Sequence, residues 1–583
     1  MVDRSVLPSV FAFVHALPPF VIATFLFFVS LAAFSWRLGE GPIYRTMEGR
    51  EALVMQEMAR SGNVVLPLRN GETIPSKPPL LHWCGVGIAL LSGGVSEWSA
   101  RFPNALFSAL SVALTFLLGC RLSGREIGVL ASLLLLTTPC FLEMSREAWV
   151  DPALAFFTLA AIASFASMYE NEQWRGWRSL IFYLALAGAT LSKGPVGYIL
   201  PVLVVVSYLA IQGQLSRLWS LASVPGLLLA IGIPAAWYAA AFAQEGWAFV
   251  QKQVLQENLV RFTAGSGKRI PSSVFFVTPF LVEGLPWSLL FGVGLWNFAR
   301  HAPVREKGVL PLIWWFAIFM FFSISAGKRN VYLLPTYPAM ALFAAEWGWP
   351  WVAAQERPLP AWLKIPLRFL AVMGAGLMVI GVVFTLSGTL TIDTPWIDRW
   401  IGEDKWNNLA IHMRFLQEFP VYASFLYGIV GLLGVWVVVM GTSGRWRAAL
   451  RGVLGLLLVT SLGMYPFTRA YFKEFKAFTG FAAAIHERVG EHDAFWFYTP
   501  ELYSSEFDEF SQVYFYLNRQ VRLAPCSEQP DFAQCPAGYY LLRERHWSDL
   551  RHLTRAHLLL DSKDSAGPDP ETRLVLVQLR AQE

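Results

Sequence analysis

The sequence predicts a polytopic α-helical membrane protein of roughly 13 transmembrane helices, with a small α/β domain at its C-terminus. Hydrophobic residues make up 55% of the 583 residues, charged residues only 15%, and the mean hydropathy is +0.45. Soluble domains carry about 25% charged residues, so this composition excludes a soluble enzyme, a disordered chain and a coiled coil. Apolar runs of about 17 to 22 residues recur along the chain, and that length crosses the hydrocarbon core of a bilayer.

The predicted spans follow one another through most of the chain. One further apolar stretch, residues 80–95, is ambiguous because it is short, follows Pro78 and Pro79, and contains His82. Judged by length and hydrophobicity, the predicted spans are residues 18–36, 103–120, 126–142, 152–169, 180–192, 195–212, 220–242, 274–298, 309–325, 331–351, 366–387, 420–441 and 452–467.

The basic loops decide how residues 80–95 are interpreted. If that stretch does not cross, the short loops with clustered Arg and Lys all fall on one side with the N-terminus, and that side is cytoplasmic. Counting the stretch as a span would move those clusters outside. We therefore interpret it as an interfacial helix lying on the membrane, with an odd number of spans and the C-terminus outside. The basic residues are Arg121, Arg125, Arg175, Arg178, Arg217, Arg300, Arg305, Lys307, Arg357, Lys364, Arg368, Arg445, Arg447 and Arg451.

This topology places large segments on the outer face. They are residues 37–102, residues 244–273 and the C-terminal tail. The loop of residues 387–419 also lies on the outer face. The first span has the position of a signal peptide, but its length predicts that it remains as an anchor. The predicted domains are a membrane domain at residues 1–467 and an outer domain at residues 468–583.

The tail changes character, because charged residues become frequent and strand-like runs appear. A helical run at residues 475–489 precedes the strands, and this order predicts a small α/β domain. Cys526 and Cys535 lie within it, and two nearby cysteines in an outer domain predict a disulfide in an oxidising compartment; two free thiols are the alternative. The strand-like runs are residues 494–498, 539–542, 557–560 and 574–579.

Charged residues collect near the outer ends of the predicted spans. Each charge at bilayer depth costs roughly 2.5–3.5 kcal/mol on insertion scales, so a charged residue there is expected to have a functional role. Asp151 begins one span, Lys193 ends another, and Lys328 and Arg329 occupy a short outer turn. The alternative interpretations are a solvated turn for the last two residues and a lysine that reaches the interface for Lys193.

The first outer segment supplies further polar groups. Residues 44–58 have the pattern of an amphipathic helix on which Glu48, Glu51 and Met55 share one face. Lys77 lies just before the N-terminus of the interfacial helix, where free N–H groups favour anions.

The outer end of the bundle would then combine carboxylates with cations. Such a mixture suits transfer from a phosphate-linked donor, because cations stabilise a departing phosphate and a carboxylate takes the proton from an attacking hydroxyl. The membrane position predicts a donor with a lipid tail. On composition and topology alone, a transporter remains an equal alternative.

Motifs over most of the chain resemble those of a known family in their order and spacing. The first outer segment is similar to the first periplasmic loop of bacterial membrane glycosyltransferases with the GT-C fold, the aminoarabinose-transferase-like and protein-mannosyltransferase-related enzymes. The residues that carry the resemblance include Glu48, Gly49, Arg50, Lys77, Pro78, Pro79, His82, Trp83, Arg101, Asp151, Pro152, Lys193, Gly194, Pro195, Glu257, Arg261, Lys328, Arg329 and Tyr332.

The resemblance implies a polyprenyl-phosphate-linked monosaccharide donor, with undecaprenyl phosphate expected, and transfer on the periplasmic side of the bacterial inner membrane, commonly by inversion. It implies that Glu48 activates or positions the acceptor and that Asp151 is a second carboxylate near the sugar or the acceptor. Lys77 would hold the donor phosphate, with Arg50 and Lys193 nearby. The residues that would complete the cavity are Lys328, Arg329, Tyr332 and Arg261.

Three positions depart from the family's loop pattern. The first of two adjacent acids is Met47 here, the Tyr that usually follows the Arg is Glu51, and the acid before Lys-Pro is Ser76. The resemblance associates these positions with catalysis or metal contact in the aminoarabinose transferases. The departures make Glu48 the leading base, weaken a metal-binding role and leave the sugar open.

The leading hypothesis is a lipid-linked sugar transferase whose acceptor is lipid A, another envelope glycan or a protein. The alternatives are a transporter or flippase of lipid-linked sugars, which inverted repeats would favour, and an inactive relative. The sequence has no such symmetry and no nucleic-acid motif. No cofactor is firmly predicted: a divalent metal is compatible with the family, but no residue pattern indicates one. Membrane lipids are expected partners.

Overall fold

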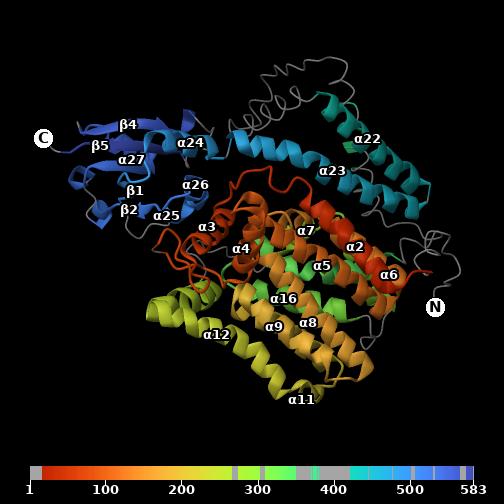
Figure 1. Ribbon diagram of the computed structural model, residues 1–583. Helices are drawn as coiled ribbons and strands as arrows, with labels where there is room; N and C mark the ends of the chain where they lie inside the picture. The colour runs from red at the N-terminus through yellow and green to blue at the C-terminus, as the bar shows by residue number, and fades with distance from the viewer. Residues whose placement is uncertain are drawn as a thin grey trace.

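The computed structural model shows a helical bundle with the C-terminal domain at one end (Figure 1). The residues that it describes are 16–71, 73–264, 274–301, 309–349, 420–443, 445–475, 477–500, 506–528, 532–553, 555–564 and 573–581, with scattered positions between 365 and 379. The predicted span 366–387 therefore lies largely outside the described residues, and the predicted outer loop 387–419 lies wholly outside them.

The first part of the bundle consists of apolar helices in antiparallel pairs. Small residues let these helices approach closely: a Cβ at Gly119 would lie 2.6 Å from the Cα of Gly128 in the next helix. The helices of this part are α2 (Pro19–Ser35), α5 (Glu97–Ser123), α6 (Arg125–Leu136), α7 (Pro139–Met144), α8 (Asp151–Asn171), α9 (Trp177–Lys193), α10 (Pro195–Ile211) and α11 (Arg217–Leu221).

The second part completes the bundle and adds a helical hairpin that contributes Val437 and Val453 to the same apolar core. The helix α12 is kinked at Gly246, where φ is +54° and ψ is −132°, and the chain continues into η2 and α13. α22 packs against α23. The elements are α12 (Val224–Phe249), η2 (Val250–Val260), α13 (Arg261–Thr263), α14 (Val277–Glu283), α15 (Trp287–His301), α16 (Leu310–Ile324), η4 (Asn330–Thr336), α17 (Tyr337–Phe343), η5 (Ala344–Gly348), α22 (Pro420–Thr442) and α23 (Trp446–Phe475).

The predicted number of about 13 spans is not reproduced by helix length and apolarity. Within the described residues, five helices are long and apolar enough to cross a membrane, or six if α14 and α15, which meet at a bend of 114°, form one span. Several predicted spans are shorter or broken: residues 126–142 divide into α6 and α7, and residues 331–351 begin with the 3-10 helix η4. The last predicted span, residues 452–467, lies within α23, whose apolar stretch Ala448–Tyr465 is long enough to cross a membrane and whose helix continues to Phe475.

Two helices lie between α2 and α5, in the segment that the sequence predicts to be outside. They are α3 (Thr46–Ser61) and α4 (Leu80–Ser92), as the sequence predicts for an amphipathic helix and for the stretch after Pro79. A left-handed residue ends each helix, Gly62 with φ +69° and Gly93 with φ +89°, a conformation that glycine adopts at no steric cost.

The tail folds into a mixed five-stranded sheet with short helices, as its pattern predicts. The strand order is β2-β1-β3-β5-β4, with β1 parallel to β2 and β3, and β5 antiparallel to β3 and β4. The two-residue strand β2 is the one described strand that the sequence analysis missed. The elements are α24 (Thr479–Arg488), β1 (Phe495–Phe497), α25 (Glu506–Glu509), α26 (Ser511–Leu517), β2 (Arg522–Leu523), η6 (Pro525–Glu528), η7 (Phe532–Gln534), β3 (Gly538–Arg543), α27 (Glu544–Leu550), β4 (Ala556–Asp561), η8 (Ser562–Asp564) and β5 (Leu574–Leu579).

The predicted disulfide closes a short loop within the sheet domain, and the domain rests on α3. Cys526 and Cys535 are bonded, with their Cα atoms 5.2 Å apart. α26 packs against α3 so closely that a Cβ at Gly49 would lie 2.5 Å from the backbone nitrogen of Gln512. The Tyr516 hydroxyl accepts a hydrogen bond from the Ile43 backbone at 2.6 Å. Helix α3 is therefore shared between the membrane bundle and the C-terminal domain.

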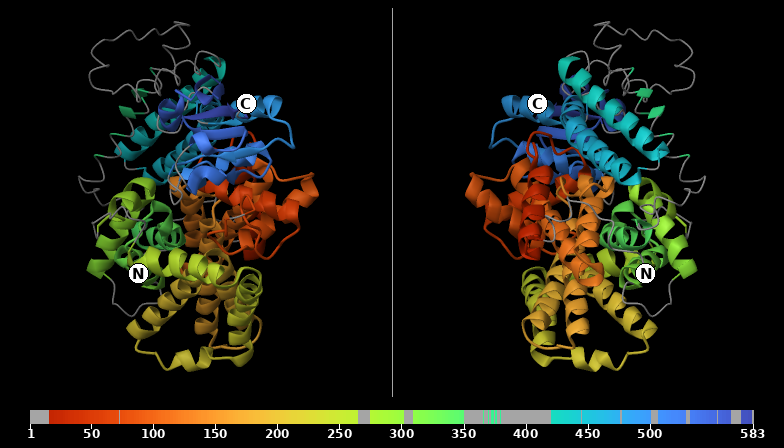
Figure 2. Two further views of the ribbon diagram at one scale, coloured as in Figure 1. Left: turned by 90° about the vertical axis from the view of Figure 1, so that its left-hand side faces the viewer. Right: turned by 90° about the vertical axis from the view of Figure 1, so that its right-hand side faces the viewer.

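The C-terminal domain and α11 lie at opposite ends of the bundle in every view (Figures 1 and 2). The basic loops between α8 and α9 and between α10 and α12 lie at the α11 end, where Arg217 pairs with Glu172 at 3.1 Å. The bundle therefore separates these basic loops from α3, α4 and the sheet.

Candidate active site

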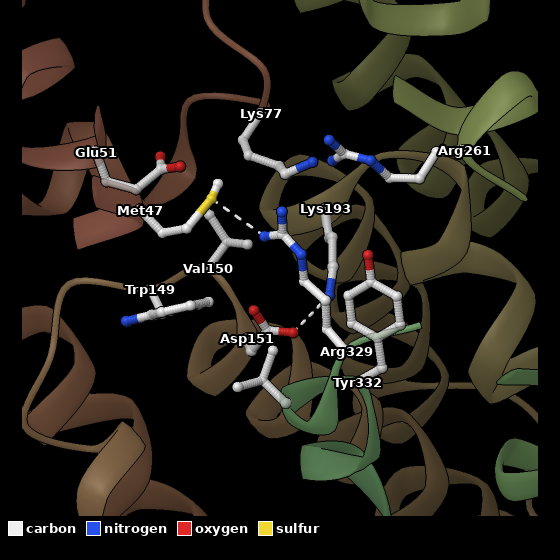
Figure 3. A pocket seen from close by; sticks show the side chains of 11 residues that line it. Met47, Glu51, Lys77, Trp149, Val150, Asp151, Lys193, Arg261, Arg329 and Tyr332 are labelled. Carbon is white, nitrogen blue, oxygen red and sulfur yellow. Dashed lines mark hydrogen bonds and ion pairs between the residues drawn. The ribbon is translucent and has the colours of Figure 1, made fainter. Parts of the chain in front are cut away.

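A small pocket with a volume of about 30 Å³ lies where α3 meets the bundle (Figure 3). Helix ends and connecting segments, rather than one element, supply its walls. The lining residues are Met47, Glu51, Lys77, Trp149, Val150, Asp151, Lys193, Arg261, Arg329, Val331 and Tyr332.

Asp151 and Lys193 face each other at neighbouring helix ends. Asp151 is the first residue of α8, where Pro152 suits the first turn because its missing N–H would have no helical partner. Lys193 is the last residue of α9, and its ammonium group forms an ion pair with Asp151. The same ammonium nitrogen lies 4.2 Å from the ring centroid of Tyr332, within cation–π range.

The turn after Lys193 depends on a glycine. Gly194 has φ +76°, and a Cβ there would lie 3.3 Å from side-chain atoms of both Asn258 and Tyr238. A larger residue would strain the backbone and press against α12 and η2. The glycine therefore lets the end of α9 approach the segment that carries Arg261.

Lys77 and Arg261 share one carboxylate at another wall of the pocket. Glu257 accepts from the Lys77 ammonium at 3.0 Å and also pairs with the Arg261 guanidinium. Burial lowers the pKa of Lys77 below its ordinary value, although the neighbouring Glu257 acts in the opposite direction. A bound anion would favour the charged form of this lysine.

Arg329 enters the pocket from the segment before η4. Its Nη1 lies 3.1 Å from the Met47 sulfur, so its described contact is with an uncharged group (Figure 3). The adjacent Lys328 points elsewhere: its ammonium donates to the backbone oxygens of Ser323 and Ser325 at 2.7 and 2.6 Å.

Cations outnumber carboxylates on the pocket wall by four to two. The cations are Lys77, Lys193, Arg261 and Arg329, and the carboxylates are Glu51 and Asp151. Partly buried cations that converge from separate elements form a site for an anion with several oxygens, such as a phosphate. In the described part of the chain, no group of three or more His, Cys, Asp or Glu side chains could hold a metal ion.

Glu48 does not line this pocket, although the resemblance makes it the leading base. Its carboxylate is fully buried and pairs with Arg101, with Arg101 Nε 2.7 Å from Oε1 and Nη2 3.2 Å from Oε2. It also accepts from the backbone N–H of Ala148 at 3.2 Å. These contacts fix α3 against α5 and against the segment before α8.

Arg50 and Lys328 also lie away from the pocket wall. Arg50 turns toward the C-terminal domain, where its Nη2 is 3.7 Å from Asp508 Oδ2 and its Nε donates to the Asp508 carbonyl at 3.3 Å. The pocket thus brings together six of the predicted site residues, namely Lys77, Asp151, Lys193, Arg261, Arg329 and Tyr332.

Sequence reasoning missed two carboxylates that matter to the geometry. In the sequence, Glu51 stands out as a departure from the family's pattern and not as a pocket residue. Glu257 carries part of the resemblance, and its spacing of i, i+4 from Arg261 was the signal that the two side chains meet.

Comparisons with known proteins agree with the resemblance. The family model of dolichyl-phosphate-mannose-protein mannosyltransferases matches residues 21–250. An uncharacterised protein of Aquifex aeolicus is 30% identical over 54% of this chain, and the alignment covers 62% of that protein. The undecaprenyl phosphate-alpha-4-amino-4-deoxy-L-arabinose arabinosyl transferase 2 of Sodalis glossinidius is 26% identical over 72% of each chain.

The fold is shared with a solved structure over nearly the whole chain. The crystal structure of ArnT from Cupriavidus metallidurans bound to undecaprenyl phosphate has a TM-score of 0.69 at 20% identity, covering 98% of this chain and 99% of that one. With the family match over the first part of the chain, the predicted resemblance is confirmed. The chain belongs to the GT-C membrane glycosyltransferases related to the aminoarabinose transferases and the protein mannosyltransferases.

Proposed function

We propose that the protein transfers a monosaccharide from a polyprenyl-phosphate donor to a hydroxyl-bearing acceptor of the bacterial cell envelope. The observation that carries this proposal is the convergence of four cations on one pocket at the end of an apolar bundle. Undecaprenyl phosphate is the expected carrier, because it appears in the name of the relative from Sodalis glossinidius and in the solved ArnT complex.

In this reaction the protein stabilises the negative charge on the departing phosphate and forms no covalent intermediate with the sugar. The acceptor oxygen attacks the anomeric carbon of the sugar, the bond from that carbon to the phosphate oxygen breaks, and its electron pair leaves with the polyprenyl phosphate. Lys77, Lys193, Arg261 and Arg329 stabilise the negative charge on that phosphate. Asp151 holds the Lys193 ammonium in place and lies close enough to the pocket to contact the sugar.

The pocket is assigned to the periplasmic face of the inner membrane. The basic loops next to α11, which begins at Arg217, lie at the other end of the bundle (Figure 1), and such loops are enriched on the cytoplasmic side. A disulfide between Cys526 and Cys535 at the pocket end supports the same orientation, because disulfides persist in oxidising compartments. Lipid A, another glycan and a protein hydroxyl all remain acceptors compatible with this side.

The adjacent residues Lys328 and Arg329 offer a matched test of the proposal. Replacing Arg329 by Gln removes one pocket cation without leaving a carboxylate unpaired, because its described contact is the Met47 sulfur. A hydrogen bond to a charged group contributes about 1.5–3 kcal/mol, so undecaprenyl phosphate should bind about 10- to 100-fold more weakly to Arg329→Gln. Lys328→Gln, one residue away and outside the pocket, should bind within about twofold of wild type.

The measurement is a titration of the purified protein in lipid nanodiscs with undecaprenyl phosphate, followed by tryptophan fluorescence or calorimetry. Equal affinity of wild type and Arg329→Gln would contradict the assignment of the pocket as the phosphate site. Weaker binding of undecaprenyl phosphate by Lys328→Gln alone would assign the phosphate site to Lys328 instead of Arg329.

A further inference from the structure

The face of α3 that reaches the pocket carries a carboxylate, Glu51. Met47 and Glu51 are four residues apart, so they lie one above the other on the same face, and both line the pocket. Glu48 is turned by about 100° from Met47 and reaches Arg101 instead. Figure 3 shows Glu51 on the opposite side of the pocket from Arg261.

Glu51 differs from the neighbouring carboxylates in its partner. Asp151 is paired with Lys193, and Glu257 with Lys77 and Arg261, so both acids neutralise cations of the phosphate site. Glu51 Oε2 instead lies 2.7 Å from His82 Nε2. A carboxylate that is held by a histidine can accept a proton without releasing a phosphate-binding cation.

The histidine is well placed to fix the orientation of this carboxylate. His82 lies in the first turn of α4 and its side chain is 1% exposed, whereas the Glu51 side chain is 13% exposed. The same segment supplies Lys77 to the pocket, since α4 follows directly after Lys77, Pro78 and Pro79. One short stretch of chain therefore positions both a phosphate-binding cation and the partner of Glu51.

We infer that Glu51, oriented by His82, is the catalytic carboxylate that accepts the proton of the attacking hydroxyl. This inference rests on the proposed transfer reaction and assigns the proton in it. As the acceptor oxygen bonds to the anomeric carbon, its O–H bond breaks and the proton passes to the Glu51 carboxylate. The electron pair of the broken sugar–phosphate bond leaves on the polyprenyl phosphate. His82 is a positioning residue, because it acts through Glu51.

The first test compares Glu51→Gln with wild type in a reconstituted transfer assay. Undecaprenyl phosphate–4-amino-4-deoxy-L-arabinose and the lipid extract of a deletion strain serve as donors, and membranes of that strain supply the acceptor. General base catalysis contributes about 10²- to 10⁴-fold, so kcat should fall at least about 100-fold while undecaprenyl phosphate affinity stays within about threefold. Glu57→Gln, on the same helix and paired with Arg60 away from the pocket, is the control.

A second test separates a lost base from a damaged fold. Azide is already deprotonated at neutral pH, so it attacks the anomeric carbon without a general base. Glu51→Gln should therefore form glycosyl azide at a rate close to that of wild type. A variant that is folded by size-exclusion chromatography, binds undecaprenyl phosphate and fails with azide as well would overturn the role as a base.

A third test addresses His82. His82→Gln keeps a nitrogen donor near the position of Nε2, whereas His82→Ala removes it. We expect kcat to fall about tenfold or more in the alanine variant and to recover largely in the glutamine variant, with KM for the donor unchanged. Equal losses in both variants would contradict the positioning role.

The outcomes distinguish the inference from the function on which it rests. Wild-type transfer together with an unimpaired Glu51→Gln variant overturns the inference alone. Failure of the wild-type protein to transfer sugar from either donor source overturns the proposed function, and the inference with it.

Discussion

Removing the Glu48 carboxylate should destabilise the folded protein rather than slow a chemical step. Glu48 and Arg101 are both 0% exposed and meet through two hydrogen bonds of 2.7 and 3.2 Å. In Glu48→Gln the side-chain volume is kept, but the guanidinium loses its counter-charge inside the protein. Breaking a buried pair from one side costs about 3–5 kcal/mol, and we expect about 3 kcal/mol because Gln still offers one acceptor oxygen.

Arg101 has further contacts that shape the expected result of a double-mutant cycle. It donates to the backbone oxygens of Leu38 at 3.0 Å, Gly41 at 2.6 Å and Pro42 at 2.9 Å. Arg101→Gln should therefore be at least as destabilising as Glu48→Gln. The double variant should lose less than the sum of the two single variants, by about 1–3 kcal/mol, because each single change leaves an uncompensated group.

The assay is equilibrium unfolding of the detergent-solubilised protein, paired with turnover per folded molecule. A loss of about 3 kcal/mol lowers the folding equilibrium constant by about two orders of magnitude. The folded fraction of Glu48→Gln should bind undecaprenyl phosphate like wild type. A Glu48→Gln variant that is as stable as wild type and yet inactive would refute this reasoning and restore Glu48 as the catalytic base.

Two further predictions concern the C-terminal domain. Burial raises the pKa of Asp508, but Arg69, at 2.9 Å, and Arg50 together lower it below its ordinary value. The ion pairs of Asp508 therefore stabilise the packing of the C-terminal domain on α3 above the unfolded-state pKa of this carboxyl. That stabilisation is lost as the pH falls through the folded-state pKa. Hydrogen exchange of α3 should therefore increase below about pH 4 in wild type and be less dependent on pH in Asp508→Asn; identical pH profiles would contradict this. Cys526 and Cys535 should appear as a bonded pair in non-reducing peptide mass spectrometry. Cys535→Ser should destabilise the domain by about 2–3 kcal/mol, because the bond closes a short loop. An unchanged unfolding midpoint of Cys535→Ser would contradict this stabilising role of the disulfide.

Much of the fold is visible in local sequence patterns. Each of the four predicted strand runs overlaps a strand, because short runs of aromatic and aliphatic residues in a polar tail are typical of strands in a buried sheet. The number of spans is harder to predict, because apolar length alone does not distinguish a continuous helix from two short ones. The break between Leu136 and Pro139 is an example, since proline disfavours helix at the residue before it.

The site residues at helix ends and turns were predictable from the sequence, and the pocket carboxylate on α3 was not. Asp151, Lys193 and Arg329 lie at helix ends or turns near the outer ends of predicted spans, so topology alone brings them to the same side. On α3, however, local periodicity grouped Glu48 with Glu51, and only tertiary packing decides which of them faces the pocket. The deciding partners, Arg101 and His82, come from α5 and α4, and local spacing in α3 carries no information about them.

The central claim is that the cationic pocket uses a polyprenyl-phosphate sugar. The most direct measurement is lipid mass spectrometry of a strain lacking the gene and of the same strain carrying wild type or Arg329→Gln. The account predicts that one polyprenyl-phosphate monosaccharide accumulates in the deletion strain and in the Arg329→Gln strain, that one envelope glycan is lost, and that wild type restores both. Unchanged pools of lipid-linked sugars in the deletion strain, with the gene expressed in its parent, would contradict it.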